Sequence, residues 1–390
     1  MFDLCELCQR NALTFLYQPE RSTRGISVHL CAYCGLVQSL PRIDREKRAP
    51  AAISGGADWG NVRYGKGFRT KIVLEAVSKH IDLNGDFTIL DVGSNRGSFA
   101  KAFLDAAPLA QLVAVEPDER VADSCRDLDR TELISARIED VALETGRFDL
   151  IHSCHTIEHL AHPAHALADH WRTLKNGGIL ILDAPNIALI GADDIVEEWF
   201  IDKHLFHFSA RTLGRMIEAA GFEIIQWPDA TDCSNLLFVA RKTAVTPRDF
   251  VGDSEEAARA EDLVTQYVAS RTCNLLALTA VAAELAHLAP RGLALWGAGR
   301  LFDSLVVHGQ FNPRTLTLLI DTHLKSLVGE RYGCMLADPE ALSESKAGVV
   351  VVMSRDFAGE IATHARKLSP RAEIVFYSDL LSRARTRLAA

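Results

Sequence analysis

The sequence predicts an α/β protein with a small metal-binding domain near its N-terminal end. Strand-length apolar runs alternate with helical segments between residues 87 and 242 and again from residue 293, and two cysteine pairs lie within the first 34 residues. A chain of 390 residues is also too long for one ordinary core. We therefore expect four parts: a zinc-binding β domain at 1–48, an α/β core at 60–245, a helical connector at 246–290 and a second α/β domain at 291–390.

Composition indicates a globular protein. Hydrophobic residues make up 48% of the chain and charged residues 24%, as in soluble domains. We find no apolar run of membrane-spanning length and no signal-peptide layout, and we therefore expect a cytoplasmic protein with no membrane partner. The net charge of −9 argues against a nucleic-acid partner, although a local basic patch would escape this count.

Four of the nine cysteines form two matched pairs with two-residue gaps: Cys5 and Cys8, then Cys31 and Cys34. Such gaps let both thiolates of a pair face one ion, and four thiolates close a tetrahedral shell around Zn²⁺. We therefore predict a structural zinc site, which would stabilise a domain too small for its own core. Four unrelated cysteines or a redox pair are the alternatives, and His29 could replace one ligand.

The segments that follow the cysteine domain can be assigned in order. Residues 41–60 are rich in Arg, Ala, Gly and Pro and predict a linker or mobile loop, and residues 66–80 carry the apolar stripe of a helix. We expect strands at 87–92, 111–116, 148–154 and 177–185, with helices at 97–107, after Pro117 and at 163–174 between them. This alternation predicts a mostly parallel sheet.

The end of this first α/β domain has a different pattern. A helix is predicted at 210–220, followed by strands at 222–227 and 235–242 with no helix between them. Two strands without a crossover helix should pair antiparallel at the edge of the sheet.

The motif Asp91-Val-Gly93-Ser94-Asn95-Arg96-Gly97 lies between the first strand and the helix after it. Glycines there let the backbone approach a ligand closely. Glu116 ends the second strand, where a carboxylate can bind both hydroxyls of a ribose. The stretch Ile138-Glu139-Asp140 precedes the third loop and could lie against an adenine. The motif could instead bind a dinucleotide phosphate, but it lacks the full G-x-G-x-x-G spacing.

Residues 60–245 resemble the class I S-adenosylmethionine-dependent methyltransferases. The resemblance implies a Rossmann-like core whose seven-stranded sheet closes with the predicted antiparallel pair. It implies S-adenosylmethionine as the cofactor, bound by a set of residues from the ends of the strands: Asp91, Gly93, Ser94, Gly97, Glu116, Pro117, Ile138, Glu139 and Cys154. A dehydrogenase is the alternative for this motif.

Two histidine-rich stretches are candidates for the chemistry. In the run from His152 to His170 we expect His155 to line the site and the others to be structural or solvent-facing. The second stretch, 202–209, follows the fifth strand and carries His204 and His207, either of which could take a proton from a methyl acceptor. The alternative is a helix-entry loop that packs its two phenylalanines and ends in Ser209 as the N-cap.

The domain order resembles a narrower family, the sugar C-methyltransferases. The segment 352–361 also resembles part of their last domain. This resemblance implies methylation of a nucleotide-linked sugar at a carbon beside a keto group, with a histidine as base. Those enzymes carry a Glu-His pair and a following Tyr in the loop 202–209, whereas this chain has Lys203-His204 and His207.

The C-terminal domain predicts a second Rossmann-like sheet, with strands near 293–296, 316–321, 348–354 and 373–379. Gly297-Ala-Gly299 after its first strand and Asp321 after its second form half of a dinucleotide fingerprint, but Phe302 replaces the third glycine. This stretch could bind a nucleotide group or form only a tight turn.

Other functions stay open at this point. They are an O- or N-methyltransferase of another natural product or glycan, an RNA-modifying protein, and a non-catalytic protein that binds the cofactor.

Overall fold

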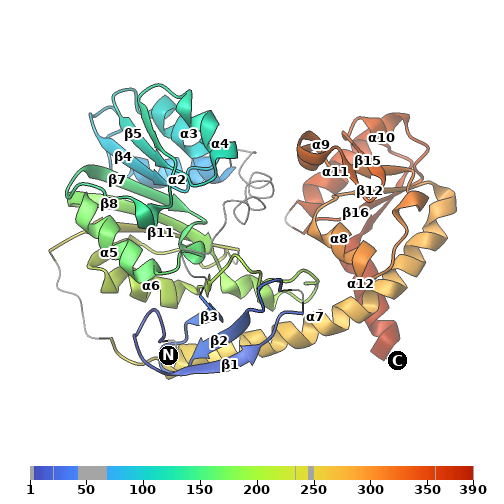
Figure 1. Ribbon diagram of the computed structural model, residues 1–390. Helices are drawn as coiled ribbons and strands as arrows, with labels where there is room; N and C mark the ends of the chain where they lie inside the picture. Colours follow the sequence, from blue (N-terminus) through green and yellow to red (C-terminus); the bar gives the residue numbers. More distant parts are fainter. Residues whose placement is uncertain are drawn as a thin grey trace. The chain divides into compact units, whose positions relative to one another are not determined.

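The computed structural model describes residues 4–20, 22–42, 68–232, 234–244, 250–355 and 357–389. It divides into two compact units, Met1–Leu189 with Phe200–Val264, and Ile190–Trp199 with Thr265–Ala390 (Figure 1). The predicted loop 41–60, except for its first two residues, lies outside the described residues, as does the start of the predicted helix 66–80.

The N-terminal part of the first unit is a four-stranded antiparallel sheet in the order β1-β2-β3-β9. Its strands are β1 (Leu13–Tyr17), β2 (Ser27–Cys31), β3 (Val37–Leu40) and β9 (Phe206–His207). Strand β9 comes from the loop 202–209, for which the sequence analysis predicts no strand. The cysteine domain and this loop are thereby joined by backbone pairing.

The seven-stranded sheet of the first unit has the order β10-β11-β8-β7-β4-β5-β6, which confirms the predicted class of fold. Its strands are β4 (Thr88–Val92), β5 (Gln111–Val115), β6 (Thr131–Ile134), β7 (Phe148–Cys154), β8 (Leu174–Pro185), β10 (Phe222–Gln226) and β11 (Asn235–Lys242). The first five pair in parallel, and β11 pairs antiparallel with both neighbours. Strand β6 escapes the sequence analysis because it is short and half polar.

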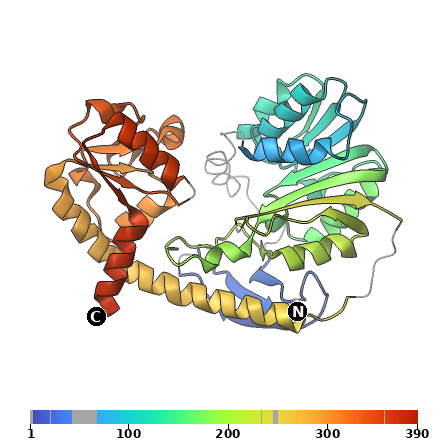
Figure 2. The same cartoon turned by 180° about the vertical axis from the view of Figure 1, so that it is seen from behind.

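Helices cover both faces of this sheet (Figures 1 and 2). Successive strand residues point to opposite faces, so Leu90 joins one apolar cluster and Ile89 the other. The covering elements are α2 (Phe68–Ser78) and α3 (Ser98–Ala106) on the side of Ile89, and α5 (Pro163–Thr173) and α6 (Ala210–Ala219) on the side of Leu90. Helix α4 (Glu119–Arg126) and the 3₁₀ turns η3 (Ile138–Asp140), η4 (Ile157–His159) and η5 (Ile187–Gly191) complete the connections.

The second unit contains a six-stranded sheet in the order β14-β15-β13-β12-β16-β17. Its strands are β12 (Leu293–Trp296), β13 (Leu318–Ile320), β14 (Glu330–Arg331), β15 (Cys334–Ala337), β16 (Val349–Val352) and β17 (Glu373–Phe376). Its helices are α8 (Arg300–Val307), α9 (Thr322–Val328), α10 (Ala341–Glu344), α11 (Ala358–Leu368) and α12 (Tyr377–Ala389), with the 3₁₀ turns η6 (Ala289–Arg291) and η7 (Pro313–Thr315). The pairing is parallel except for the short hairpin of β14 and β15.

Helix α7 (Ser254–Leu288) occupies the stretch for which we predict a helical connector. Among the described residues, the segment Ser254–Arg291 alone is long and apolar enough to cross a membrane, by length and composition only. The sequence analysis did not recognise such a run. Val264 in this helix is buried, and Leu278 and Leu285 belong to the core of the second unit. These buried positions account for part of its apolar character.

Candidate active site and four-cysteine site

The glycine motif forms the turn between β4 and α3. Gly93 and Gly97 both have positive φ, 73° and 72°. A Cβ on Gly93 would lie 2.1 Å from Thr156 Oγ1, and one on Gly97 would lie 2.8 Å from Cys125 Sγ. The turn therefore requires glycine at both positions for conformation and for space. Ser94, between them, is buried.

Asp91 holds two strand ends together next to this turn. Its Oδ1 lies 2.7 Å from Nδ1 of His152, on the neighbouring strand β7, and both side chains are 1% exposed. His152, the first of the histidine run, is therefore structural. Asp91 was predicted to bind the cofactor, and its pairing with His152 gives it at least a supporting role for the turn.

Glu116 lies directly after β5 and is 7% exposed. One oxygen accepts a hydrogen bond from Asn95 N at 2.8 Å and the other from Asp118 N at 2.9 Å. Burial raises the pKa of this carboxyl, although the two backbone donors oppose the shift. The predicted ribose ligand thus lies beside the glycine turn, where Pro117 follows it.

Ile138 and Glu139 lie in the 3₁₀ turn η3. The Glu139 carboxylate accepts hydrogen bonds from Ala161 N at 2.9 Å and His162 N at 3.4 Å, just before α5. Both residues line a pocket with one face of α5. A pocket therefore lies between η3 and α5, beside the two residues that the sequence analysis predicts for the adenine.

The carboxyl ends of β7 and β8 bring Cys154 and His155 to a buried carboxylate, Asp183. Cys154 Sγ lies 3.7 Å from Asp183 Oδ2, and Arg69 of α2 forms an ion pair with the same oxygen. His155 has a positive φ of 48°, and its Nε2 lies 2.9 Å from Asn235 Oδ1. The sequence analysis missed Arg69 and Asp183, although Asp183 follows an apolar strand run as Asp91 does.

A second group that the sequence analysis missed surrounds Glu158 in η4. Glu158 is fully buried, and burial raises its pKa to about 8. His159 Nε2 lies 3.7 Å and His155 Nδ1 3.8 Å from Glu158 Oε1. The rings of His159 and His204 are 4.9 Å apart. The structure therefore brings together His155 and His204, two predicted catalytic residues, around an acid adjacent in sequence to His159.

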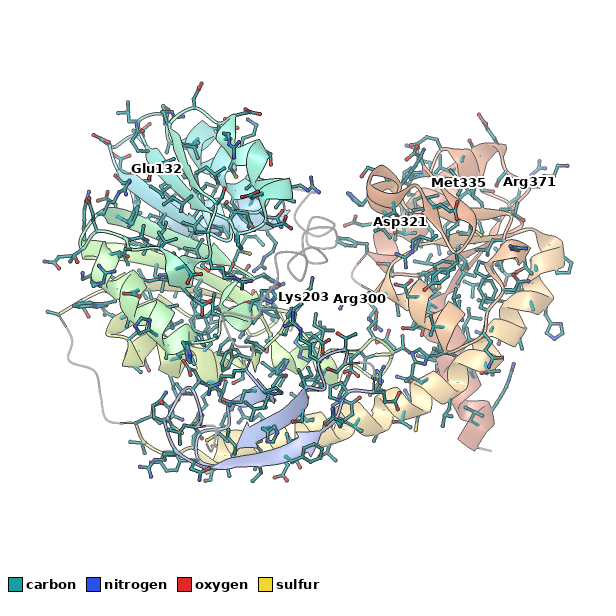
Figure 3. The ribbon with its side chains drawn as sticks, in the orientation of Figure 1. Glu132, Lys203, Arg300, Asp321, Met335 and Arg371 are labelled. Atoms are coloured by element: carbon teal, nitrogen blue, oxygen red, sulfur yellow. The ribbon has the colours of Figure 1, made fainter. Side chains whose placement is uncertain are left out.

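His204 is held in place by its loop. His159 Nδ1 bonds to Lys203 O at 2.9 Å, and Leu205 N donates to Glu158 O at 2.8 Å. Figure 3 shows Lys203 in the first unit. The carboxylate of Asp202 accepts hydrogen bonds from Ser22 and Thr23 of the cysteine domain.

His207 takes a different position from His204. It is 2% exposed on β9, its Nε2 lies 2.9 Å from Ser39 Oγ, and its ring contacts Phe200. Burial lowers its pKa to about 3, so the ring is neutral. Helix α6 follows, and the side chain of its N-cap residue Ser209 accepts a hydrogen bond from Thr212 N in a capping box. These contacts favour the structural alternative for His207.

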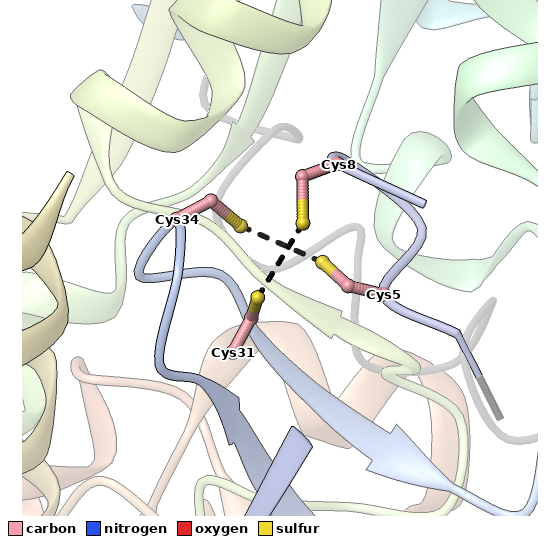
Figure 4. A group of neighbouring side chains, drawn as sticks. All are labelled: Cys5, Cys8, Cys31 and Cys34. Carbon is pink, nitrogen blue, oxygen red and sulfur yellow. Dashed lines mark hydrogen bonds between the residues drawn. The ribbon is translucent and has the colours of Figure 1, made fainter. Parts of the chain in front are cut away.

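The four cysteines of the two pairs converge on one point (Figure 4). Their sulfur atoms all lie within 4.8 Å of one another, with Cys5 to Cys34 and Cys8 to Cys31 both at 3.5 Å. Sulfur hydrogen bonds from Cys34 and Cys5 lower the pKa of Cys31. Sulfurs bonded to one tetrahedral Zn²⁺ at about 2.3 Å are separated by about 3.8 Å, so the donor set has the dimensions of such a shell.

The glycine stretch of the second unit is a tight turn. Asp321, labelled in Figure 3, accepts hydrogen bonds from Ala298 N at 3.0 Å and Leu324 N at 3.0 Å, so it supports the turn and caps α9. Gly297 has a φ of 117°, and a Cβ there would lie 2.5 Å from Met353 O. Asp321 therefore holds this turn in place through backbone hydrogen bonds, as Glu116 does for the glycine turn of the first unit.

Comparison with known proteins finds a match for most of the first unit. Residues 34–227 match a family model described as a methyltransferase domain. The 2-O-methyltransferase NoeI of Sinorhizobium fredii is 46% identical over 68 residues, 16% of this chain and 27% of that protein. An uncharacterized 37.1 kDa protein in transposon TN4556 of Streptomyces fradiae is 28% identical over 98 residues, 24% of this chain and 28% of that protein. The matches thus span little more than a quarter of these relatives.

Solved structures are similar to about half of the chain. An S-adenosylmethionine-dependent methyltransferase from Aquifex aeolicus has a TM-score of 0.39 and 17% identity, covering 50% of this chain and 99% of that one. Another, from Mesorhizobium loti, has a TM-score of 0.37 and 16% identity, covering 49% of this chain and all of that one (100%).

The matched family model thus describes a methyltransferase domain at residues 34–227, which includes the seven-stranded sheet and the glycine turn. S-adenosylmethionine is the methyl donor that the sequence analysis predicts for this domain. The residues present suit this cofactor, because Gly93 leaves space that any Cβ would fill and Glu116 offers a buried carboxylate beside it.

Proposed function

We propose that this methyltransferase acts on a nucleotide-linked sugar, at a site bounded by η4 and the loop 202–205. The observation that carries the proposal is the group around Glu158, in which His155, His159 and His204 meet beside the glycine turn. Thr156, two residues before Glu158, lies against Gly93. A set of bases at this edge of the sheet is suited to removing a proton from an acceptor near the cofactor.

The chain's own residues would perform two tasks in this reaction. S-adenosylmethionine supplies the methyl group from its sulfonium. The turn 91–97 and Glu116 would orient the cofactor, and placement of the acceptor in line with the methyl group would supply much of the rate enhancement. His204, as the resemblance to the sugar C-methyltransferases implies, would accept the proton from the acceptor.

We also propose that Cys5, Cys8, Cys31 and Cys34 hold a structural zinc ion. The spacing of the four sulfurs supports a closed shell with no position for a substrate. Asp202 bonds to Ser22 and Thr23 of the same domain, so the zinc site would stabilise the loop that carries His204.

The acceptor atom has two candidates. A carbon beside a keto group is implied by the resemblance to the sugar C-methyltransferases. An oxygen acceptor is supported by the similarity to NoeI, a 2-O-methyltransferase that is 46% identical over 68 residues, and on the proposed substrate this atom would be a hydroxyl oxygen.

One experiment tests the proposal and separates the two atoms. The protein is incubated with S-adenosylhomocysteine and a nucleotide-linked ketosugar in D₂O, and deuterium is followed by NMR. Carbon methylation predicts exchange at the carbon beside the keto group. In parallel, S-adenosylmethionine and a panel of nucleotide-linked sugars are screened for a methylated product by mass spectrometry. A methylated hydroxyl without deuterium exchange would select the second candidate, and no methylated sugar in the panel would overturn the proposal.

A further inference from the structure

Glu158 presents a buried carboxylate that has no hydrogen-bond partner. It is 1% exposed, and both of its carboxylate oxygens lack a hydrogen-bond partner within the described part of the chain. The closest imidazole nitrogens, on His159 and His155, lie at 3.7 and 3.8 Å from Oε1, beyond hydrogen-bond distance. A buried ionised carboxylate in this state is costly unless a cation or a proton compensates its charge.

The orientation of His159 shows which of its ring nitrogens faces Glu158. Its Nδ1 lies 2.9 Å from Lys203 O. Because a carbonyl oxygen only accepts, Nδ1 carries the hydrogen, and Nε2 of the neutral ring has a lone pair. That Nε2 is the atom 3.7 Å from Glu158 Oε1. Metal-bound histidines commonly donate their other N–H to a backbone carbonyl in this way.

His155 has the same arrangement, with its hydrogen directed away from Glu158 and its lone pair directed toward it. Its Nε2 lies 2.9 Å from Asn235 Oδ1, so this nitrogen is the donor and Nδ1, which faces Glu158, has the lone pair. Lone pairs of His159 and His155 therefore face the buried carboxylate of Glu158. A cation or a proton beside Glu158 would compensate the charge of this carboxylate.

His204 completes a set of ligands for a metal ion. One ligand atom each of Glu158, His159 and His204 lies within 4.8 Å of the others. Bonds of about 2.0–2.2 Å would place neighbouring ligand atoms about 3.0–3.5 Å apart. The observed separation of 3.7 Å between His159 and Glu158 needs a closure of only a few tenths of an ångström.

We propose that Glu158, His159 and His204 bind one divalent transition-metal ion whose remaining positions are open to the acceptor. Two imidazoles and one carboxylate suit Fe²⁺, Co²⁺, Ni²⁺ or Zn²⁺. The site is separate from the four cysteines, which form a closed sulfur shell. The sequence analysis proposed no metal here, since the ligands come from η4 and from a loop after β8.

The ion would serve the reaction by binding an oxygen of the acceptor. For a hydroxyl acceptor, coordination lowers the pKa of the O–H group. The O–H bond breaks, the proton goes to His155, and the oxygen electron pair forms the bond to the methyl carbon while the carbon–sulfur pair stays on sulfur. This role rests on the proposed function, whereas ion binding itself does not. His204 would then act through the ion and not as the base.

The test uses Co²⁺ as the probe, because its visible absorption reports its ligands. Co²⁺ is titrated into the full-length protein with zinc already in the four-cysteine site. We expect one Co²⁺ to bind per chain. Its visible spectrum should indicate nitrogen and oxygen ligands and should show no thiolate charge-transfer band. Glu158→Gln, His159→Ala and His204→Ala should each weaken binding by more than about tenfold. His287→Ala, which removes an exposed histidine of α7, should bind as the parent does.

Two controls keep the result interpretable. Circular dichroism and the affinity for S-adenosylhomocysteine must match the parent in each variant, since the ligands are outside the glycine turn. A parent that binds no Co²⁺ up to millimolar concentration, or only with a thiolate band, would overturn the inference and assign a proton to the site. So would a His159→Ala variant with unchanged affinity.

The proposal of the metal ion and the proposal of the sugar acceptor can be refuted separately. Co²⁺ binding without methylation of any nucleotide-linked sugar would overturn the proposed acceptor and leave the ion site intact. Methylation of such a sugar by a protein that binds no Co²⁺ would overturn the proposed ion site and leave the proposed acceptor intact.

Discussion

Glu116 combines an observed structural role with a proposed role in cofactor binding. It accepts backbone hydrogen bonds from Asn95 and Asp118, and it is the predicted ligand of the ribose. These bonds fix the turn that follows Gly93. A substitution at Glu116 should therefore affect the cofactor through both the lost carboxylate and the loosened turn.

Glu116→Ala should weaken binding of S-adenosylhomocysteine by about 1.5–3 kcal/mol, or roughly ten- to hundredfold, the usual size of a lost charged hydrogen bond. Calorimetric titration measures this directly. Glu119→Ala, which removes an exposed carboxylate in the first turn of α4, serves as the control. An unchanged affinity in Glu116→Ala would show that the ribose lies elsewhere.

The buried His207 predicts a pH dependence of stability. Its pKa is about 3 in the folded chain, lowered by burial, against about 6.5 when unfolded. A lowered pKa means that the unfolded state takes up the proton first, so stability is fully present above pH 6.5 and is lost as the pH falls toward 3. Between pH 7 and pH 5 this single group should cost about 2 kcal/mol of unfolding free energy.

His207→Phe removes that titration and keeps an aromatic ring on β9. Its loss of stability between pH 7 and pH 5, measured by urea unfolding, should be smaller than the parent's by about 2 kcal/mol. The difference between the two proteins cancels other titrating groups such as His170, whose pKa burial lowers to about 4. Parallel pH profiles would mean that His207 is accessible to solvent.

At the scale of elements, the turn between β4 and α3 depends on its contact with η4. The structure places Gly93 against Thr156, whose Oγ1 also bonds to Val92 O. Residues of the cofactor turn and of the Glu158 group are thereby linked by packing. A side chain at position 93 would disturb both.

Gly93→Ala should weaken S-adenosylhomocysteine binding by more than about tenfold, because its Cβ would overlap Thr156 and push the turn outward. Gly146→Ala is the matched control, since Gly146 has a similar φ of 66° and nothing within 4 Å of its Cβ position. That variant should lose only about 1–2 kcal/mol of stability from left-handed backbone strain. Equal effects on cofactor affinity in the two variants would contradict the contact with η4.

The sequence predicted regular elements better than the contacts between them. Alternating strands and helices followed from apolar periodicity, and the antiparallel closing pair followed from the missing helix before Asn235. Strand β9 could not be predicted, because two residues pair with β3 only through tertiary contact. The role of Glu158 was missed for a similar reason, since its burial and its distance to His204 depend on a loop far along the chain.

At the largest scale, the cysteine domain supports the loop 202–209 within the first unit. Strand β3 pairs with β9, and Ser22 and Thr23 bond to Asp202. Loss of metal from the four cysteines should thus disturb the positions of the residues around His204 within the first unit. Within the described part of the chain, no hydrogen bond joins the glycine turn 91–97 to this domain.

Cys8→Ser should reduce the zinc content below the predicted one ion per chain, measured by metal analysis, and should lower methyl transfer more than cofactor affinity. Cys273→Ser, at an exposed cysteine of α7, should keep its zinc and its activity. Metal-free parent protein, purified without chelators, would refute the zinc site itself.

In our proposal, acceptor chemistry takes place at the group formed by Glu158, His159 and His204. The most direct measurement is methyl transfer by His204→Ala on the sugar identified in the panel, with the affinity for S-adenosylhomocysteine determined alongside. We predict turnover about a hundred- to ten-thousandfold below the parent at nearly unchanged cofactor affinity, whether His204 acts as a base or as a metal ligand. Turnover within a fewfold of the parent would contradict the claim and place the chemistry elsewhere.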